Sequence, residues 1–228
     1  MKLPEPLFEG KLIARYKRFL VDVALSESHI VTAHCPNSGS MMGLLQPGSV
    51  ALLSASSNPN RKLLFTWELV KVKDSWVGVN TINPNRLIYE SLQNAAIPEL
   101  AEYREIKKEV LWQSGCRFDF MLGDGSRRCF VEVKNVTLAR ENVARFPDAV
   151  TVRGTKHLRH LMEVVSRGHR AVMLFLVNRS DCDRFQPAAD IDSVYAETLR
   201  EALDNGVEML VYRARSEPPA IELDGRLL

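Results

Sequence analysis

Two carboxylates and a lysine, Asp119, Glu132 and Lys134, are the residues of this chain whose types and spacing best suit chemistry. Two carboxylates held close together repel each other, and a divalent cation between them offsets that repulsion. Oxygen ligands are what Mg²⁺ and Mn²⁺ prefer in proteins. The sequence therefore predicts a site for one of these ions on Asp119 and Glu132, with the backbone carbonyl of Val133 as a further ligand.

These residues lie on a predicted hairpin. Segments 117–122 and 127–134 have strand-like sequences, and the Gly-Asp-Gly-Ser sequence between them is typical of a turn. Because side chains alternate along a strand, Glu132 shares a face with the lysine two residues later. A turn centred on the Asp-Gly pair places Asp119 opposite Phe130 and within about 7–8 Å of Glu132 along the diagonal.

The Asp-x(12)-Glu-x-Lys spacing resembles the signature of PD-(D/E)xK nucleases. In that family the acids hold magnesium, and the lysine helps to position or activate water at a phosphodiester. The resemblance implies catalytic roles for Asp119, Glu132 and Lys134. The alternative is structural, because the same spacing also fits an ion pair between Lys134 and either acid.

The first part of the chain has the pattern of an all-β unit. Its turns contain Pro, Gly and Asn, and its expected strands cover residues 12–25, 29–34, 50–55, 63–73 and 76–81. Five short strands in about 75 residues predict a small closed barrel, for which an OB-like fold is the first choice. We expect residues 1–82 to form this barrel and to bind DNA.

The second part, residues 83–228, alternates helices with strands, so the expected fold class is a two-domain α/β protein. Expected helices cover 85–96, with Asn85 as the cap, 155–167 and 192–203; expected strands besides the hairpin cover 105–113, 171–177 and 207–213. The order αβββαβ, followed by αβ, is the core of the PD-(D/E)xK nuclease-like fold. It places the two acids on the second and third strands.

Further motifs are spread over nearly the whole chain. They are Cys35–Met41, Asn80-Thr81 with Pro84-Asn85, Arg117–Phe120, Val131–Leu138, Phe146–Ala149 with Arg153-Gly154, and His157-Leu158. Together they resemble the sugar fermentation stimulation protein A (SfsA) family. The resemblance implies an OB-like domain joined to a nuclease-like domain, DNA binding without marked sequence preference, and a regulatory link to sugar (maltose) metabolism. It does not by itself imply an enzymatic activity.

Basic side chains on both predicted domains are candidates for phosphate contacts. On the barrel they are interleaved with aromatic residues, which is typical of a surface that follows a nucleic-acid backbone. The candidates there are Arg15, Lys17 and Arg18, with Lys11 nearby; on the helix at 155–167 and just before it they are Arg153, Lys156 and His157, with His160 beside them. Each set fits an ordinary solvated face as well.

Two further acids are candidates near the site. Glu90 lies on the helix before the sheet, where many PD-(D/E)xK enzymes carry an additional acid, so it is a tentative catalytic residue. The apolar periodicity of that helix points Glu90 away from the core, which fits solvent equally well. Asp148 opens a loop that either closes over the site or only makes a turn.

Composition limits the remaining possibilities. The chain has 228 residues, is 46% hydrophobic and carries a net charge of +2, as expected for a globular protein with only a weak overall preference for nucleic acid. Its four cysteines form no Cys-x-x-Cys pair, and no leader or membrane-spanning pattern is visible, so we expect a cytoplasmic protein with no membrane partner.

The motifs and the resemblance together favour a DNA-binding protein without sequence preference that carries a nuclease-like metal site, and three activities stay open for it. They are a magnesium-dependent nuclease, a non-catalytic DNA-binding regulator that keeps the nuclease fold, and a nuclease-fold module acting on RNA or a nucleotide. The sequence does not decide between them, and it leaves the oligomeric state open.

Overall fold

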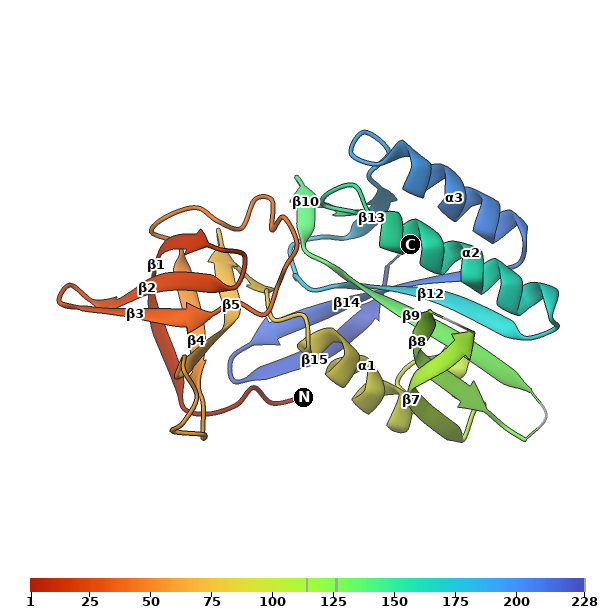
Figure 1. Ribbon diagram of the computed structural model, residues 1–228, viewed down its shortest axis with the longest axis horizontal. Helices are drawn as coiled ribbons and strands as arrows, with labels where there is room; N and C mark the ends of the chain where they lie inside the picture. The colour runs from red at the N-terminus through yellow and green to blue at the C-terminus, as the bar shows by residue number, and fades with distance from the viewer. Residues whose placement is uncertain (114, 126, 228) are drawn as a thin grey trace.

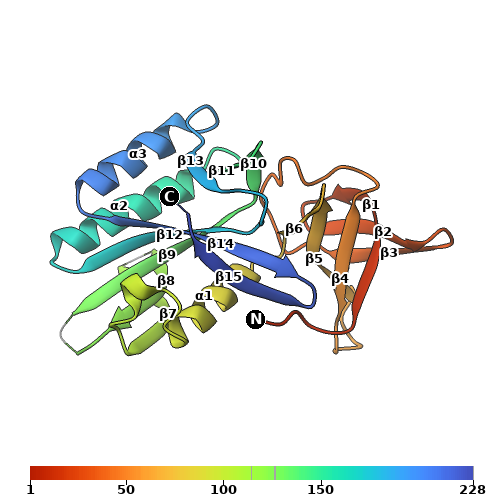
Figure 2. The ribbon, with the colours of Figure 1, turned by 180° about the vertical axis from the view of Figure 1, so that it is seen from behind.

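The computed structural model describes residues 1–113, 115–125 and 127–227. It has two parts, a β-barrel at one end and a mixed sheet with helices on both faces at the other (Figures 1 and 2). Both expected architectures, the OB-like barrel and the α/β nuclease-like unit, are confirmed. Within the described ranges, no helix is long and apolar enough to cross a membrane.

The barrel has six strands in the order β3-β2-β1-β4-β5-β6, and a β3–β5 contact closes it. The strands are β1 (Leu7–Tyr16), β2 (Leu20–Ser26), β3 (His29–His34), β4 (Val50–Ala55), β5 (Phe65–Val72) and β6 (Ser75–Gly78). Its interior is apolar and centres on Trp67, which is fully buried.

The expected strand at 12–25 is wrong, because the chain turns in the middle of it. β1 and β2 pair antiparallel, and the turn between them contains Lys17 and Arg18 with φ angles of 48° and 62°. These are left-handed conformations for residues other than glycine. Apolar alternation continues through Val21 and Val23 on the far side, and no Gly or Pro marks the turn, so the sequence pattern showed no break.

The second part is built on a six-stranded sheet in the order β15-β14-β12-β9-β8-β7. Its strands are β7 (Glu105–Gln113), β8 (Cys116–Gly123), β9 (Arg128–Val136), β12 (Arg170–Val177), β14 (Glu208–Glu217) and β15 (Ala220–Arg226). Helix α1 (Asn83–Gln93) packs on one face, while α2 (Val152–Ser166) and α3 (Ser193–Asp204) cover the other. Central strand β12 is parallel to β9 and β14, and it is buried on both faces as its apolar run predicts.

Several elements differ from the expectations. A short 3₁₀ helix, η1 (Pro98–Leu100), follows α1. The sequence pattern also did not predict the edge strand β15 or a small sheet of three strands, β10 (Leu138–Arg140), β11 (Val143–Phe146) and β13 (Arg184–Pro187). Helix α2 begins three residues early, because the Thr151 hydroxyl accepts from the Gly154 N–H and caps it. Helix α1 is preceded by Ile82, so the expectation that Asn85 caps it is wrong.

The two parts are joined by buried polar contacts. Glu68 of β5, only 1% exposed, accepts hydrogen bonds from Ser54, from Asn80 and from Asn83 at the start of α1. A buried carboxylate that receives this many donors is costly to disturb. The barrel is therefore held in a defined orientation toward the sheet that carries the acids.

Candidate metal centre

The hairpin of β8 and β9 brings the two predicted acids together, although not in the expected register. Phe120 pairs with Val131, which is two residues away from a register that pairs Asp119 with Phe130. The turn is closed by the hydrogen bond from the Asp124 N–H to the Arg127 carbonyl, so it is centred later than the Asp-Gly pair. The pairing ends at Phe120 and Val131, so Asp119 and Glu132 are the next residue on each strand beyond the last pair.

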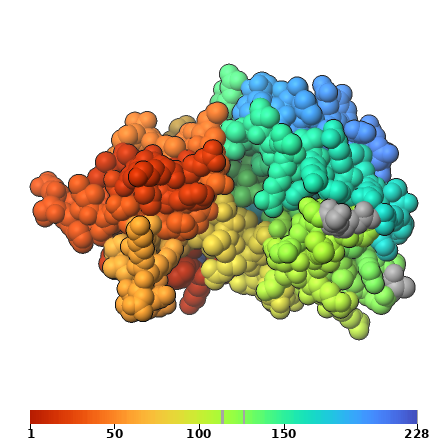
Figure 3. Space-filling model, viewed as in Figure 1, coloured from red at the N-terminus to blue at the C-terminus, as the bar shows by residue number. Residues whose placement is uncertain are grey.

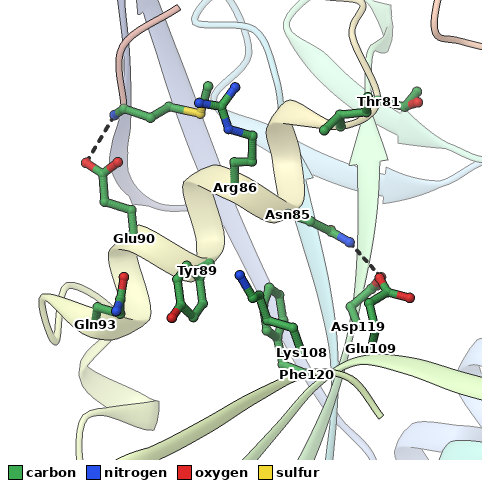
Figure 4. Close-up of a pocket in the computed structure, with 12 residues that line it drawn as sticks. Thr81, Asn85, Arg86, Tyr89, Glu90, Gln93, Lys108, Glu109, Asp119 and Phe120 are labelled. Carbon is green, nitrogen blue, oxygen red and sulfur yellow. Dashed lines mark hydrogen bonds and ion pairs between the residues drawn. The ribbon is translucent and has the colours of Figure 1, made fainter. Parts of the chain in front are cut away.

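Asp119 is held from two sides. Its Oδ2 accepts a hydrogen bond from the Val133 N–H at 2.8 Å, and its Oδ1 accepts one from the Asn85 side chain at 2.7 Å (Figure 4). Asn85 comes from α1, which lies on the other side of the sheet from α2. The carboxylate therefore lies where β8 separates from β9, with α1 fixing its orientation.

Glu132 is buried, with 3% of its surface exposed, and only one of its oxygens is bonded. Oε1 accepts a hydrogen bond from Lys134 Nζ at 2.6 Å and also contacts His157 Nδ1, from α2. Oε2 is buried and has no hydrogen-bond partner within the described part of the chain. A buried carboxylate oxygen without a donor is unfavourable, and this oxygen is available to accept a ligand.

These surroundings move the two pKa values in opposite directions. Burial, followed by repulsion from Glu132, raises the pKa of Asp119 to about 6. Burial also pushes the pKa of Glu132 upward, but the hydrogen bond from His157 and the charge of Lys134 outweigh it and lower that pKa. One acid is thus kept ionised while the other is destabilised as an anion, which is the electrostatic condition that a bound cation relieves.

The donor set fits a divalent cation that keeps part of its water shell. Within residues 1–113, 115–125 and 127–227, no three His, Cys, Asp or Glu side chains form a ready-made metal cage. The bare Glu132 Oε2 and the Asp119 carboxylate supply two oxygen donors from neighbouring strands. Mg²⁺ is bound in proteins by one or two carboxylates plus waters and substrate phosphates, so two acids are sufficient. The Val133 carbonyl stays a predicted additional ligand.

Glu90 is not brought to this site. Its carboxylate faces the N-terminal ammonium of Met1 at 3.3 Å, at the other end of the hollow that Asp119 lines (Figure 4). The α1 residue that reaches Asp119 is Asn85, and sequence reasoning missed this role because it assigned Asn85 to the helix cap. The sequence indicated a functional role for Asn85 only through the motif of Asn80-Thr81 with Pro84-Asn85.

The basic residues predicted on the barrel are exposed or half-buried. Lys17 and Arg18 occupy the β1–β2 turn in solvent, and Arg15 is anchored by a 2.7 Å hydrogen bond from its Nη2 to the Asn37 carbonyl. Arg15 and Arg18 line a hollow of about 550 Å³ between the barrel and the segment that leads into α2. Asp148 borders this hollow and accepts a hydrogen bond from the Met41 N–H, so it attaches the barrel loop rather than covering the acids.

The predicted residues of α2 differ in exposure. Arg153 and Lys156 are exposed, whereas His157 is buried against Glu132. Arg153 nevertheless reaches His157, because its Nε donates a hydrogen bond to His157 Nε2 at 3.4 Å. His157 is 7% exposed and contacts Glu132, a position suited to orienting that carboxylate; its contact with a phosphate stays a prediction. His160 faces Glu163 on the same helix.

Figure 3 shows one face of the molecule, on which the barrel meets the α/β part. The red and orange barrel, the yellow segment that contains α1 and the turquoise α2 surround recessed green atoms of the sheet region. The barrel and α2, the two elements that carry the predicted basic residues, therefore both border this recess.

Family models match both parts of this chain. The model described as "SfsA N-terminal OB domain" matches residues 13–79, and the model described as "Sugar fermentation stimulation protein RE domain" matches residues 82–220. The chain belongs to the sugar fermentation stimulation protein A family.

Relatives agree with this assignment over the full length. The chain is 52% identical over 227 residues to the "Sugar fermentation stimulation protein homolog" of Geotalea uraniireducens, covering 100% of this chain and 98% of the relative. It is 53% identical to the homolog of Geobacter sulfurreducens, covering 100% and 97%. A solved structure described as Pyrococcus furiosus SfsA in complex with Ca²⁺ superimposes with a TM-score of 0.90 at 26% identity, covering 100% and 98% of the two chains.

Proposed function

We propose that this SfsA-family protein is a metal-dependent nuclease that binds DNA through its phosphate backbone and hydrolyses phosphodiester bonds at Asp119, Glu132 and Lys134. The observation that carries the proposal is the state of Glu132. One of its buried oxygens is bonded by Lys134 and His157, and the other is bare beside a carboxylate whose pKa is raised to about 6.

The cation we propose is Mg²⁺ or Mn²⁺, held by Asp119 and Glu132. The described complex of a structural relative with Ca²⁺ supports an oxygen-ligand site in the family, since Ca²⁺ prefers the same donors. When bound, such a cation stabilises negative charge on a phosphate and lowers the pKa of water.

The protein side chains have separate tasks in this proposal. His157 and the buried surroundings hold Glu132 ionised and oriented, and Asn85 orients Asp119. Lys134 is anchored on Glu132 Oε1, and its remaining N–H donors can hold a water or a phosphate oxygen beside the acids. An ion pair between Lys134 and Glu132 alone, the structural alternative, leaves Glu132 Oε2 unexplained.

DNA binding in this proposal rests on Arg15, Lys17 and Arg18 of the barrel and on Arg153 and Lys156 of α2. Exposed cations of this kind contact phosphates and carry no base-specific information, so binding should vary little with sequence and weaken steeply with salt.

A second candidate is a non-catalytic DNA-binding regulator linked to sugar (maltose) metabolism. The name shared by the relatives favours it, because "sugar fermentation stimulation" describes an effect on metabolism and not a reaction. The intact acids and lysine favour the nuclease.

The test is incubation of the pure protein with single-stranded DNA, duplex DNA and RNA, each with Mg²⁺, with Mn²⁺ or with EDTA. We expect metal-dependent cleavage by the wild type and none by Glu132→Gln. Binding without cleavage of any substrate would leave the regulator as the better explanation, and cleavage of RNA alone would identify an RNA-directed enzyme.

A further inference from the structure

A groove leads away from the acids between helix α1 and strands β7 and β8. It has a volume of about 590 Å³, and Asp119 and Asn85 line one end of it (Figure 4). On the helix side its wall is made by residues spaced four apart, Asn85, Tyr89 and Gln93, which fall on one face. The groove therefore begins at Asp119 of the proposed metal centre and runs along the face of α1 that carries Asn85, Tyr89 and Gln93.

The middle of the groove carries an aromatic ring and an ammonium in contact. Lys108 Nζ lies 4.1 Å from the ring centroid of Tyr89, and that ring is nearly parallel to Phe120, with centroids 6.3 Å apart. Lys108 and Phe120 are paired neighbours on β7 and β8, so both rise toward α1 from the same side of the sheet. Tyr89 is only partly buried, which leaves ring surface open to a ligand.

The charges of the groove favour an anionic ligand. Apart from Asp119 at the metal end, the acids of the groove are paired: Glu90 with the Met1 ammonium at 3.3 Å and Glu109 with Arg117 at 3.8 Å. Among the described residues, no carboxylate forms an ion pair with Lys108. A cation next to a half-exposed aromatic ring is the combination that holds a phosphate and stacks the adjoining base in single-strand binding proteins.

We propose that this groove binds the nucleotides that flank the scissile phosphate as a single strand, with a base stacked on Tyr89 and its phosphate on Lys108. The proposal rests on the nuclease function above and specifies its substrate: the strand must be unpaired on the side that enters the groove. The bases of a duplex are paired and stacked on each other, so a duplex has no free base to stack on Tyr89.

The test is binding of a set of single-stranded DNA oligonucleotides of about ten nucleotides. Each carries one 2-aminopurine, at a different position in each oligonucleotide, because base stacking changes the fluorescence of 2-aminopurine. Titrations are done with Ca²⁺ present, and a gel checks that the oligonucleotide stays intact. We expect the wild type to quench a probe at one or two adjacent positions. Tyr89→Leu, which keeps an apolar contact with Phe120, should weaken binding about tenfold and abolish that quenching, and Tyr89→Phe should restore both.

Lys108→Ala has a matched control on the same strand. Lys107 alternates to the other side of β7 and pairs with Glu105 at 2.8 Å, so Lys107→Ala should bind as the wild type does. Lys108→Ala should bind more weakly and lower the log–log salt slope by about 0.7.

The groove and the nuclease can fail separately. Equal effects of the two lysine variants, unchanged binding by Tyr89→Leu, or binding of duplex alone would overturn the groove proposal, even if the wild type cleaves DNA. Quenching that depends on Tyr89 in a protein that cleaves nothing would support the groove and overturn the nuclease.

Discussion

The acids of the β8–β9 hairpin and the cations of the β1–β2 turn hold their charges in opposite ways. Glu132 is buried and contacted by Lys134 and His157, whereas Lys17 and Arg18 stand in solvent in a turn with left-handed backbone. A buried charge affects stability and pKa values even without a ligand, while an exposed charge contributes almost nothing until a phosphate arrives. Mutation of the hairpin should therefore change stability, metal binding or cleavage, and mutation of the turn should change only DNA binding that depends on salt.

The largest expected effect comes from Lys134→Ala. If Lys134 positions water or phosphate beside the acids, cleavage should slow by a factor of about 10² or more, while DNA affinity stays unchanged. Single-turnover cleavage with Mg²⁺ and a parallel binding titration measure the two quantities. Lys107→Ala, an exposed lysine that pairs with Glu105 and has no part in the proposed site, is the control. A loss of thermal stability without a specific loss of rate would instead identify Lys134 as a structural partner of Glu132.

The next effect concerns Asp119→Asn in the absence of metal. Because the folded pKa of about 6 exceeds the ordinary value of 3.8, the folded state binds the proton more tightly. This contribution to stability is present at low pH and is lost as pH rises through 6, an amount of about 3 kcal/mol. In EDTA at pH 8, Asp119→Asn should therefore raise Tm, and at pH 5 the gain should shrink.

The same variant should lose the gain in Tm that Mn²⁺ gives the wild type, because it removes a ligand. Thermal melts with EDTA and with Mn²⁺ test both halves, and the exposed Asp74→Asn serves as control. A variant less stable than the wild type in EDTA at pH 8 would show that ionised Asp119 is not under repulsion.

A smaller effect is the pH dependence of metal binding. Mn²⁺ must displace the proton of Asp119, so the apparent affinity should be level above pH 6 and fall about tenfold per pH unit below it. Calorimetry in buffers of different ionisation enthalpy measures the proton release directly. Release of a proton at pH 5.5 but none at pH 8 is expected, and equal release at both would assign the proton to another group.

The smallest effect is that of the barrel turn. Replacing Arg15, Lys17 and Arg18 together by Ala should lower the log–log salt slope of duplex binding by up to about three units. Fluorescence anisotropy over a range of salt concentrations measures the slope. Lys62→Ala, on another barrel loop, is the control. An unchanged slope in the triple variant would exclude this turn from the DNA surface.

The pattern of the sequence predicted most of the fold and the central part of the candidate site. Alternating and continuous apolar runs located the barrel, the central strand β12 and the αβββαβ order, because burial on one face or two imposes those periods. It failed at the turn through Lys17 and Arg18, where apolar alternation continues without Gly or Pro, and at Asn85, whose polar side chain fits a cap as well as a partner for a distant acid.

By itself, the sequence determined that Glu132 and Lys134 share a strand and that Asp119 lies on the strand before it, since these relations are local. Only the tertiary structure decided which groups surround them. His157 and Asn85 reach the acids from helices on opposite faces of the sheet, and Glu90 turns instead to the N-terminus. Those contacts depend on how the helices pack and on the exact register of the hairpin. A one-dimensional pattern constrains neither, because many packings bury the same apolar faces.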